Sequence, residues 1–285
     1  MEEVINGILI REVETKNIMT KSSLPVGGYS VNPYVGCTHA CKYCYASFMK
    51  RFTGHKEEWG TFLDVKHWPE IKNPKKYAGQ RVVIGSVTDG YNPQEEQFGN
   101  TRKLLEQLIG SGADILICTK SDLVVRDIDL LKKHGRVTVS WSINTLDENF
   151  KNDMDSASSI ERRITAMKQV YEAGIRTVCF VSPVFPGITD FEAIFERVKD
   201  QCDLFWLENL NLRGGFKKTI MDYIAGKYPD LVPLYDEIYN KHNRSYFEAL
   251  EVKAEKMAKK YDCPFVDNEM PYGRVPQGHP EIVDY

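Results

Sequence analysis

The chain has 285 residues, of which 42% are hydrophobic, and this is enough for one large α/β domain or two small ones. Its formal net charge is −3, so no overall positive field attracts nucleic acid. The apolar runs are far shorter than the roughly 20 residues of a membrane helix, and the start Met1-Glu2-Glu3 lacks the positive charge of a signal peptide. Seven cysteines, with three close together, are typical of metal binding in a reducing compartment. Composition therefore predicts a cytoplasmic protein without a membrane anchor.

Residues 1–28 predict a short, irregular N-terminal lead-in. After it, short β-rich runs alternate with amphipathic stretches of helical length, which is the pattern of βα units around a parallel sheet. The expected strands are 29–34, 82–87, 115–119, 137–143, 177–182 and 204–207. The expected helices are 100–108, 123–133, 160–173 and 191–201. Six such units predict an α/β fold, a partial (β/α)6 TIM-like barrel over residues 29–220.

From about residue 221 the barrel pattern gives way to a helical C-terminal extension and tail, 221–285. A long charged helix is expected near 243–260, because polar and apolar residues alternate there with a helical period. The tail 271–285 holds three prolines and two glycines, which predicts a loosely ordered segment or one that wraps the surface.

The cysteines Cys37, Cys41 and Cys44 form a CX3CX2C run after the first barrel strand. Soft sulfur ligands select iron–sulfur clusters, zinc or copper(I) over hard cations. No fourth cysteine lies nearby in the sequence, and the remaining cysteines are scattered singly, mostly in apolar runs typical of buried residues. A [4Fe–4S] cluster held by three cysteines leaves one iron open to a substrate or cofactor.

Two other interpretations of the cysteines remain. A zinc site could take a distant fourth ligand, such as His39, His55 or Cys263. Cys41 and Cys44 could form a CxxC redox pair, although this would leave Cys37 unexplained.

The CX3CX2C run, with the aromatic Tyr43 before its last cysteine, resembles the cluster loop of the radical S-adenosylmethionine (SAM) superfamily. The resemblance implies a [4Fe–4S] cluster whose open iron binds SAM, and it implies the same (β/α)6 fold. It also implies an enzyme that reductively cleaves SAM to a 5′-deoxyadenosyl radical, which abstracts hydrogen in lyase- or oxidoreductase-type chemistry. A reductant such as flavodoxin or ferredoxin would supply the electron.

Unusual polar residues follow the predicted barrel strands, where ligands gather in parallel sheets. Following the family, the backbone beside Tyr43 would meet the adenine of SAM, and Asp89 in Thr88-Asp89-Gly90 would meet its amino group. Lys120 would meet the SAM carboxylate. The complete set of expected cofactor-binding residues is Tyr43, Ser86, Thr88, Asp89, Lys120, Ser140, Ser142 and Glu208.

Further matches, such as Asn32-Pro33-Tyr34 and Thr119-Lys120-Ser121, resemble the spore-photoproduct-lyase-like branch of this superfamily. Within the branch, residues 31–50 and 208–213 are similar to the radical SAM mobile pair proteins, which implies a second radical SAM protein as a partner. The true repair lyase has a hydrogen-donating cysteine after its second strand, where this chain has Val87-Thr88. Repair of spore photoproduct is therefore not expected.

Two tyrosines near the predicted mouth of the barrel, Tyr45 and Tyr91, are the candidate catalytic residues, because a phenol can relay a hydrogen atom. Two competing functions remain beside the enzyme. The chain could be a zinc-binding interaction or nucleic-acid module without catalysis, or it could carry a cluster as the non-catalytic subunit of a paired radical SAM protein. Nucleic acid stays open as a substrate through the resemblance, although the net charge does not indicate it.

Overall fold

The computed structural model describes residues 2–22 and 28–261, and it contains two β-sheets side by side. The larger sheet has the strand order β11-β10-β9-β8-β7-β4-β3. Its strands are β3 (Thr20–Lys21), β4 (Tyr29–Val31), β7 (Arg81–Ile84), β8 (Asp114–Thr119), β9 (Arg136–Ser142), β10 (Arg176–Val184) and β11 (Leu204–Asn209). From β4 to β11 every neighbouring pair is parallel and follows the chain order. This confirms the predicted partial barrel and all six of its predicted strands.

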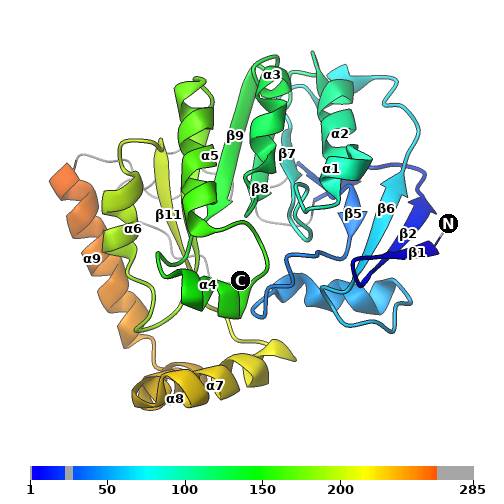
Figure 1. Ribbon diagram of the computed structural model, residues 1–285. Coiled ribbons are helices and arrows are strands. Elements are labelled where there is room, and N and C mark those ends of the chain that lie inside the picture. Colours follow the sequence, from blue (N-terminus) through cyan, green and yellow to red (C-terminus); the bar gives the residue numbers. More distant parts are fainter. Residues whose placement is uncertain (1, 23–27, 262–285) are drawn as a thin grey trace.

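Helices cover the outer face of this sheet (Figure 1). They are α1 (Glu95–Phe98), α2 (Asn100–Leu108), η3 (Leu123–Asp127), α3 (Ile128–Leu131), α5 (Ile160–Glu172), α6 (Phe191–Val198) and α9 (Ser245–Tyr261). The predicted helix 123–133 is split into the 3-10 helix η3 and the short α3, since the β-branched pair Val124 and Val125 favours α-helix weakly. The Ser159 side chain caps α5, because it accepts a hydrogen bond from the backbone N–H of Arg162.

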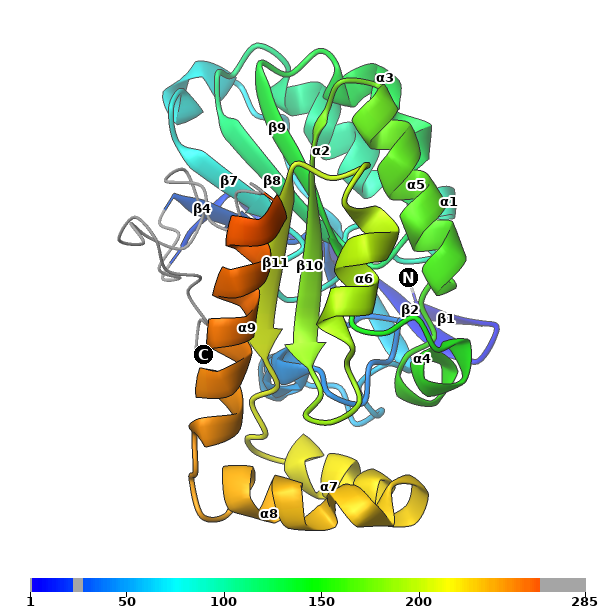
Figure 2. The ribbon, with the colours of Figure 1, turned by 90° about the vertical axis from the view of Figure 1, so that its left-hand side faces the viewer.

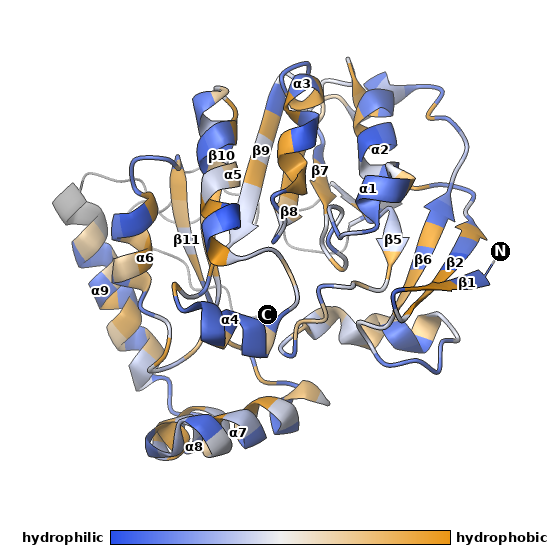
Figure 3. Ribbon diagram, viewed as in Figure 1, coloured by the Kyte–Doolittle hydropathy of each residue, from blue (hydrophilic) through white to orange (hydrophobic). Residues whose placement is uncertain are grey.

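Along a barrel strand, alternate side chains face the hydrophobic core and the barrel interior. Val139 and Trp141 of β9 face the helices in the main hydrophobic core, together with Leu104 of α2 and Met167 of α5. The intervening residues of β9, including Ser140, therefore face the inside of the barrel. Figure 3 shows the same division by hydropathy, with apolar strands behind helices whose outer faces are hydrophilic.

The N-terminal segment corrects the expectation of an irregular lead-in. A second sheet of order β1-β2-β6-β5 is built from β1 (Glu2–Ile5), β2 (Ile8–Glu14), β5 (Tyr34–Val35) and β6 (Phe62–His67). The turn Asn6-Gly7 joins β1 and β2 with positive φ values of 49° and 78°, the conformation that a tight hairpin requires. The Asn-Gly pair was the available sequence signal. The partner of β2 could not be seen, because β6 begins almost fifty residues later.

The C-terminal extension consists of α7 (Phe216–Lys227), η4 (Pro229–Leu231), α8 (Val232–Tyr239) and α9. α7 and α8 lie beyond the carboxyl ends of the strands, and α9 runs back along β11 (Figures 1 and 2). Phe247, Leu250 and Ala254 of α9 belong to the main core, so this helix completes the outer layer of the barrel. The tail 271–285 lies outside the described residues. Among those described, no helix has the length and apolar character needed to cross a membrane.

Candidate functional site

The cysteine loop follows β5 and packs directly against β6. Gly36 has φ 88°, and a Cβ there would lie 2.3 Å from the backbone oxygen of Phe62. Gly60 has φ 102°, and its Cβ would lie 2.6 Å from the Cβ of Ala40. These contacts allow only glycine at both positions, because any side chain would push the loop away from the strand. The second sheet is therefore the surface against which the cysteine loop packs.

Aromatic and charged side chains stabilise this surface of the second sheet. The ring of His55 stacks on Phe62 at 4.0 Å, and Trp59 meets Phe62 edge-on at 5.8 Å. The two ring nitrogens of His55 lie 2.9 Å from Glu57 and 2.8 Å from Asp64. Both nitrogens are thus engaged, so His55 is not available as the fourth ligand of the zinc alternative.

Cys37 is buried, Cys41 and Cys44 are half-buried, and the three thiols lie within electrostatic reach of one another. Burial raises the pKa of Cys37 and of Cys41 to about 12, and that of Cys44 to about 11. Among the described residues, no group of three His, Cys, Asp or Glu side chains is arranged to hold a single metal ion. A [4Fe–4S] cluster places a different iron at each cysteine, so its ligands need not converge on one point. The loop fits a cluster better than a zinc ion. Cys263, the remaining candidate for zinc, lies outside the described residues.

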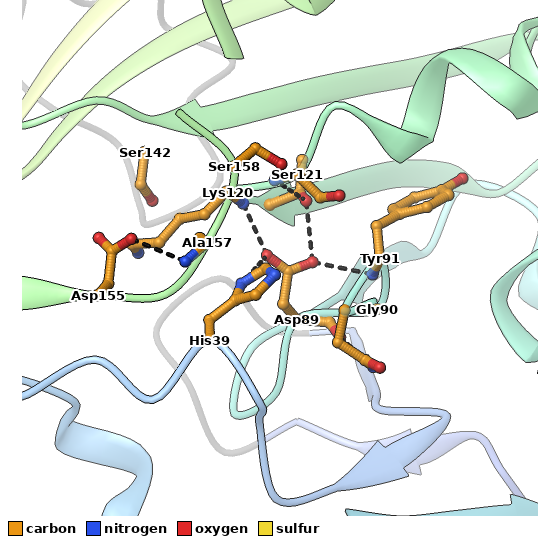
Figure 4. Close-up of polar contacts among 12 residues, drawn as sticks. His39, Asp89, Gly90, Tyr91, Lys120, Ser121, Ser142, Asp155, Ala157 and Ser158 are labelled. Carbon is orange, nitrogen blue, oxygen red and sulfur yellow. Dashed lines mark hydrogen bonds and ion pairs between the residues drawn. The ribbon is translucent and has the colours of Figure 1, made fainter. Parts of the chain in front are cut away.

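Asp89 is a buried carboxylate that connects three segments of the site (Figure 4). One of its oxygens accepts from the backbone N–H of Tyr91 and the hydroxyl of Thr119, both at 2.9 Å. The other accepts from the backbone N–H of Lys120 at 2.7 Å and lies 3.2 Å from Nδ1 of His39. Burial alone would raise the pKa of the Asp89 carboxyl. His39 and these hydrogen-bond donors lower it by more than burial raises it, so the net pKa falls below its usual value. The carboxylate stays ionised and holds the cysteine loop to the ends of β7 and β8.

Lys120 places a positive charge beside the cysteine loop. Its Nζ lies 5.7 Å from the centroid of the Tyr43 ring. Burial lowers the pKa of Lys120, but the nearby Cys41 and Asp155 outweigh this, and the net pKa is raised. No carboxylate in the described part of the chain lies within ion-pair distance of this ammonium group. The Lys120 ammonium group is therefore charged, has no carboxylate partner among the described residues, and can bind an anionic group of a ligand.

A second buried group, absent from the sequence predictions, fixes the loop from the other side. Asp155 accepts from the Tyr43 hydroxyl at 3.2 Å and from the fully buried Arg163 at 2.7 Å. Arg163 also donates to the backbone oxygens of Ser142, at 3.1 Å, and of Ser158, at 2.8 Å. The helical period was the missed signal, because Arg163 lies on the apolar face of α5 and not on the solvated face that a basic pair suggests.

Three more of the predicted cofactor residues form hydrogen bonds with other parts of the protein. Thr88 donates to the backbone oxygen of Gly36, and Ser86 bonds to Ser30 and Asn32, so both connect β7 to neighbouring segments. Glu208 accepts from Ser182 inside the barrel. Burial raises the pKa of Glu208, although Ser182 and Lys120 offset part of this.

Ser142 and Ser140 share the inner face of β9, but they differ in depth. Ser142 lies near Lys120 and Asp155 (Figure 4). Ser140 has a buried hydroxyl without a hydrogen-bond partner among the described residues, and it lines a cavity of 420 Å³. This cavity also contacts Arg81 and Asp114 at the amino ends of the strands, so it lies opposite the cysteine loop. The structure does not bring Ser140 to the loop.

The structure separates the two tyrosines that were predicted to be catalytic. Tyr45 is 57% exposed, and its hydroxyl donates to the backbone oxygen of Ser86 at the end of β7. Tyr91 is fully buried in the main core, where its hydroxyl donates to Asp127 at 3.0 Å. Figure 4 shows its ring pointing away from Asp89 and Lys120. The turn after β7 directs Tyr91 behind the sheet, so the structure does not bring it to the cysteine loop.

The chain matches the Radical SAM superfamily over residues 31–198, a range that contains the cysteine loop and the strands from β5 to β10. It belongs to the radical SAM superfamily. Proteins of this family use a [4Fe–4S] cluster and SAM.

Relatives of this radical SAM protein occur in archaea and viruses. It is 36% identical over 236 residues to an uncharacterized protein of Methanocaldococcus jannaschii, covering 82% of this chain and 88% of the relative. It is 27% identical over 180 residues to the radical SAM Nalpha-GlyT isomerase of Pseudomonas phage M6, covering 61% of this chain and 36% of the relative.

Its fold is similar to that of spore photoproduct lyase. A structure of the lyase with bound AdoMet and dinucleoside spore photoproduct gives a TM-score of 0.56 at 19% identity, covering 77% of this chain and 66% of the lyase. A structure of the lyase complexed with dinucleoside spore photoproduct gives 0.56 at 17% identity, with the same coverage. At this identity the similarity establishes the fold of the radical SAM protein, including the partial barrel.

We predict that Asp89→Asn destabilises the fold and reduces cluster content. An amide has one acceptor oxygen and no charge, so donors that now share the carboxylate lose their partner, at a cost of about 2 to 3 kcal/mol. Urea unfolding and the iron and sulfide content after reconstitution would measure both effects. The control Asp129→Asn changes a carboxylate that is 55% exposed, and it should cost less than about 1 kcal/mol. Equal results for the two variants would contradict the prediction.

We also predict that Trp59→Phe makes the reduction potential of the cluster more negative. The indole nitrogen of Trp59 is buried without an aligned hydrogen-bond partner among the described residues, yet it lies near enough to the Cys44 sulfur to stabilise its thiolate. Such a donor stabilises the reduced, more negative cluster. Potentiometric titration followed by electron paramagnetic resonance would measure the shift.

The matched control for this variant is Trp68→Phe. Its indole nitrogen donates to Gln107 at 3.0 Å, away from the cysteines, and its removal should leave the potential unchanged. A Trp59→Phe potential equal to wild type would show that the indole does not act on the cluster.

Proposed function

We propose that this chain is a radical SAM enzyme in which Cys37, Cys41 and Cys44 bind a [4Fe–4S] cluster and SAM binds the open iron. When both are bound, they supply a one-electron reductive cleavage of SAM to a 5′-deoxyadenosyl radical, which removes a hydrogen atom from the substrate. The observation that carries the proposal is the pairing of three neighbouring thiols, one buried and two half-buried, with the ammonium group of Lys120 at the carboxyl ends of the strands.

Lys120 would bind the carboxylate of SAM. Its ammonium group is charged, and it lies beside the Tyr43 ring next to the loop that holds the thiols. An opposite charge that arrives there gains a charge-assisted hydrogen bond without displacing an existing ion pair. Glu208 and Ser142 face the same interior and could receive polar groups of SAM from the other side.

Asp89 would position the site and not contact the amino group of SAM directly, because four protein groups already surround its carboxylate. The backbone oxygens after β7 are the better acceptors for that amino group. Thr88 supports this role, since its hydroxyl fixes the same segment to the cysteine loop at Gly36.

Tyr45 is the remaining candidate for hydrogen transfer. It follows Cys44 directly, and its hydroxyl contacts the backbone of Ser86 at the end of a barrel strand. A substrate that enters from the carboxyl ends would meet this exposed ring first. We propose that Tyr45 contacts the substrate, and that a second radical SAM protein, implied by the resemblance to the mobile pair, acts with this chain.

We predict that Lys120→Met weakens SAM binding. Loss of a hydrogen bond to a charged group costs about 1.5 to 3 kcal/mol, which corresponds to roughly a 10- to 150-fold higher Kd. Isothermal titration of the reconstituted protein with SAM would measure it. Lys103→Met is the control, because that ammonium group lies 4.5 Å from the Trp68 ring, away from the site. Unchanged affinity in Lys120→Met would remove this lysine from the binding site.

The function is tested by 5′-deoxyadenosine production from SAM and dithionite, with anaerobically reconstituted protein. Wild type is expected to form the product, and Cys41→Ala is expected to form none, because the cluster then lacks a ligand. An intact cluster without product would favour the non-catalytic subunit, and adding the paired protein would test that role. Stoichiometric zinc without labile sulfide would instead support the zinc module.

A further inference from the structure

An exposed aromatic face lies directly beside the cysteine loop. The 3-10 helix η1 (Tyr45–Phe52) begins at Cys44, which is its N-cap residue. Phe48 is 41% exposed and Phe52 is 68% exposed on this helix. Neighbouring exposed aromatics indicate a binding surface, because their apolar area is unfavourable in water and is removed from water when a partner covers it. Figure 1 shows the helix in blue, below β6.

The same face is positively charged. The guanidinium group of Arg51 lies 5.3 Å from the Phe48 ring and 4.9 Å from the Phe52 ring. Lys50 adds a second cation and donates to the backbone oxygen of Lys56 at 3.0 Å. We call Phe48, Lys50, Arg51 and Phe52 the η1 face.

The η1 face is close to the cluster ligands along the chain. A 3-10 helix rises roughly 2 Å per residue, so Phe48 and Phe52 lie about 8 and 16 Å from Cys44 along the helix axis. An electron that reaches the cluster by this face would cross only one short helix. Cys37 is buried and Cys41 and Cys44 are half-buried, so the η1 face lies on the surface that adjoins the last of the three cysteines.

We propose that the η1 face docks an acidic one-electron donor protein of the flavodoxin type. The inference rests on the proposed function, which requires such an electron. In this step one electron passes from the reduced flavin to the oxidised cluster, and no bond is made or broken. Redox encounters use small interfaces, of less than about 1,200 Å², and charge complementarity accelerates them. Two aromatic rings with two cations fit an interface of this kind.

A single-stranded nucleic acid is a weaker fit to the same face. Binding its backbone requires a track of cations, with aromatic rings for successive bases. Here Glu57 and Glu58 follow Lys56 directly and interrupt such a track. A small redox interface needs only a local pair of cations beside apolar contact area, and Lys50 and Arg51 supply the cations next to the two rings.

The test is a stopped-flow measurement of cluster reduction in the reconstituted full chain. Reduced flavodoxin is one reductant, and dithionite is the other. The double variant Arg51→Glu with Phe52→Ser should slow reduction by flavodoxin roughly tenfold or more, because attraction becomes repulsion. Reduction by dithionite should be unchanged, since a small reductant needs no docking face. The wild-type rate with flavodoxin should also fall as salt is added.

The matched control is Val252→Ser with Lys253→Glu on α9, where Val252 is 49% exposed. It likewise replaces an apolar residue by Ser and a cation by Glu, away from the cysteine loop, and should not alter either rate. Equal flavodoxin rates in the η1 variant and the control would overturn the docking site. If the η1 variant instead loses binding to a labelled oligothymidylate while its flavodoxin rate is unchanged, the face binds nucleic acid and the inference is wrong. A wild-type protein that dithionite cannot reduce would refute the proposed function itself.

Discussion

The site depends on one buried carboxylate. Asp89 is almost inaccessible to water, and its two oxygens meet groups from the cysteine loop, from the turn after β7 and from the end of β8. An ionised carboxylate in such a place is stable only while these partners stay in position, since a buried charge without them is costly. In turn, the charge fixes the cysteine loop, which follows a strand of the second sheet, to the ends of two paired strands of the first. Asp155 repeats the arrangement with Arg163 on the opposite side of the loop.

The barrel could be predicted because its signals are local. Each parallel strand is a short apolar run, each covering helix has a 3.6-residue period, and neighbours in the sequence are neighbours in the sheet. The three cysteines were equally clear, since their spacing carries the chemistry. Lys120 was proposed because it follows a strand, and in the structure its ammonium group lies beside the Tyr43 ring of the cysteine loop.

The predictions failed where a position depends on distant parts of the chain. Tyr91 lies only two residues after Asp89, but the turn between them sends one side chain into the site and the other into the core. Arg163 was not among the predicted site residues, because only the packing of α5 shows that this arginine is buried. The second sheet was missed because the pairing of β2 with β6 joins residues about fifty positions apart, and sequence periodicity does not report register between remote strands.

The second sheet also determines the order in which the site can form. Its strands, the cysteines and the glycines that fit the loop against β6 all lie within the first 67 residues. During synthesis this part leaves the ribosome before β8 to β11 exist, so the thiols are made before the residues that later pack around them. The segments that contain Asp89, Lys120 and Arg163 are synthesised later, and their hydrogen bonds then hold the cysteine loop against the barrel. The chain order thus leaves an interval in which metal and sulfide can reach the cysteines before the completed barrel restricts access to them.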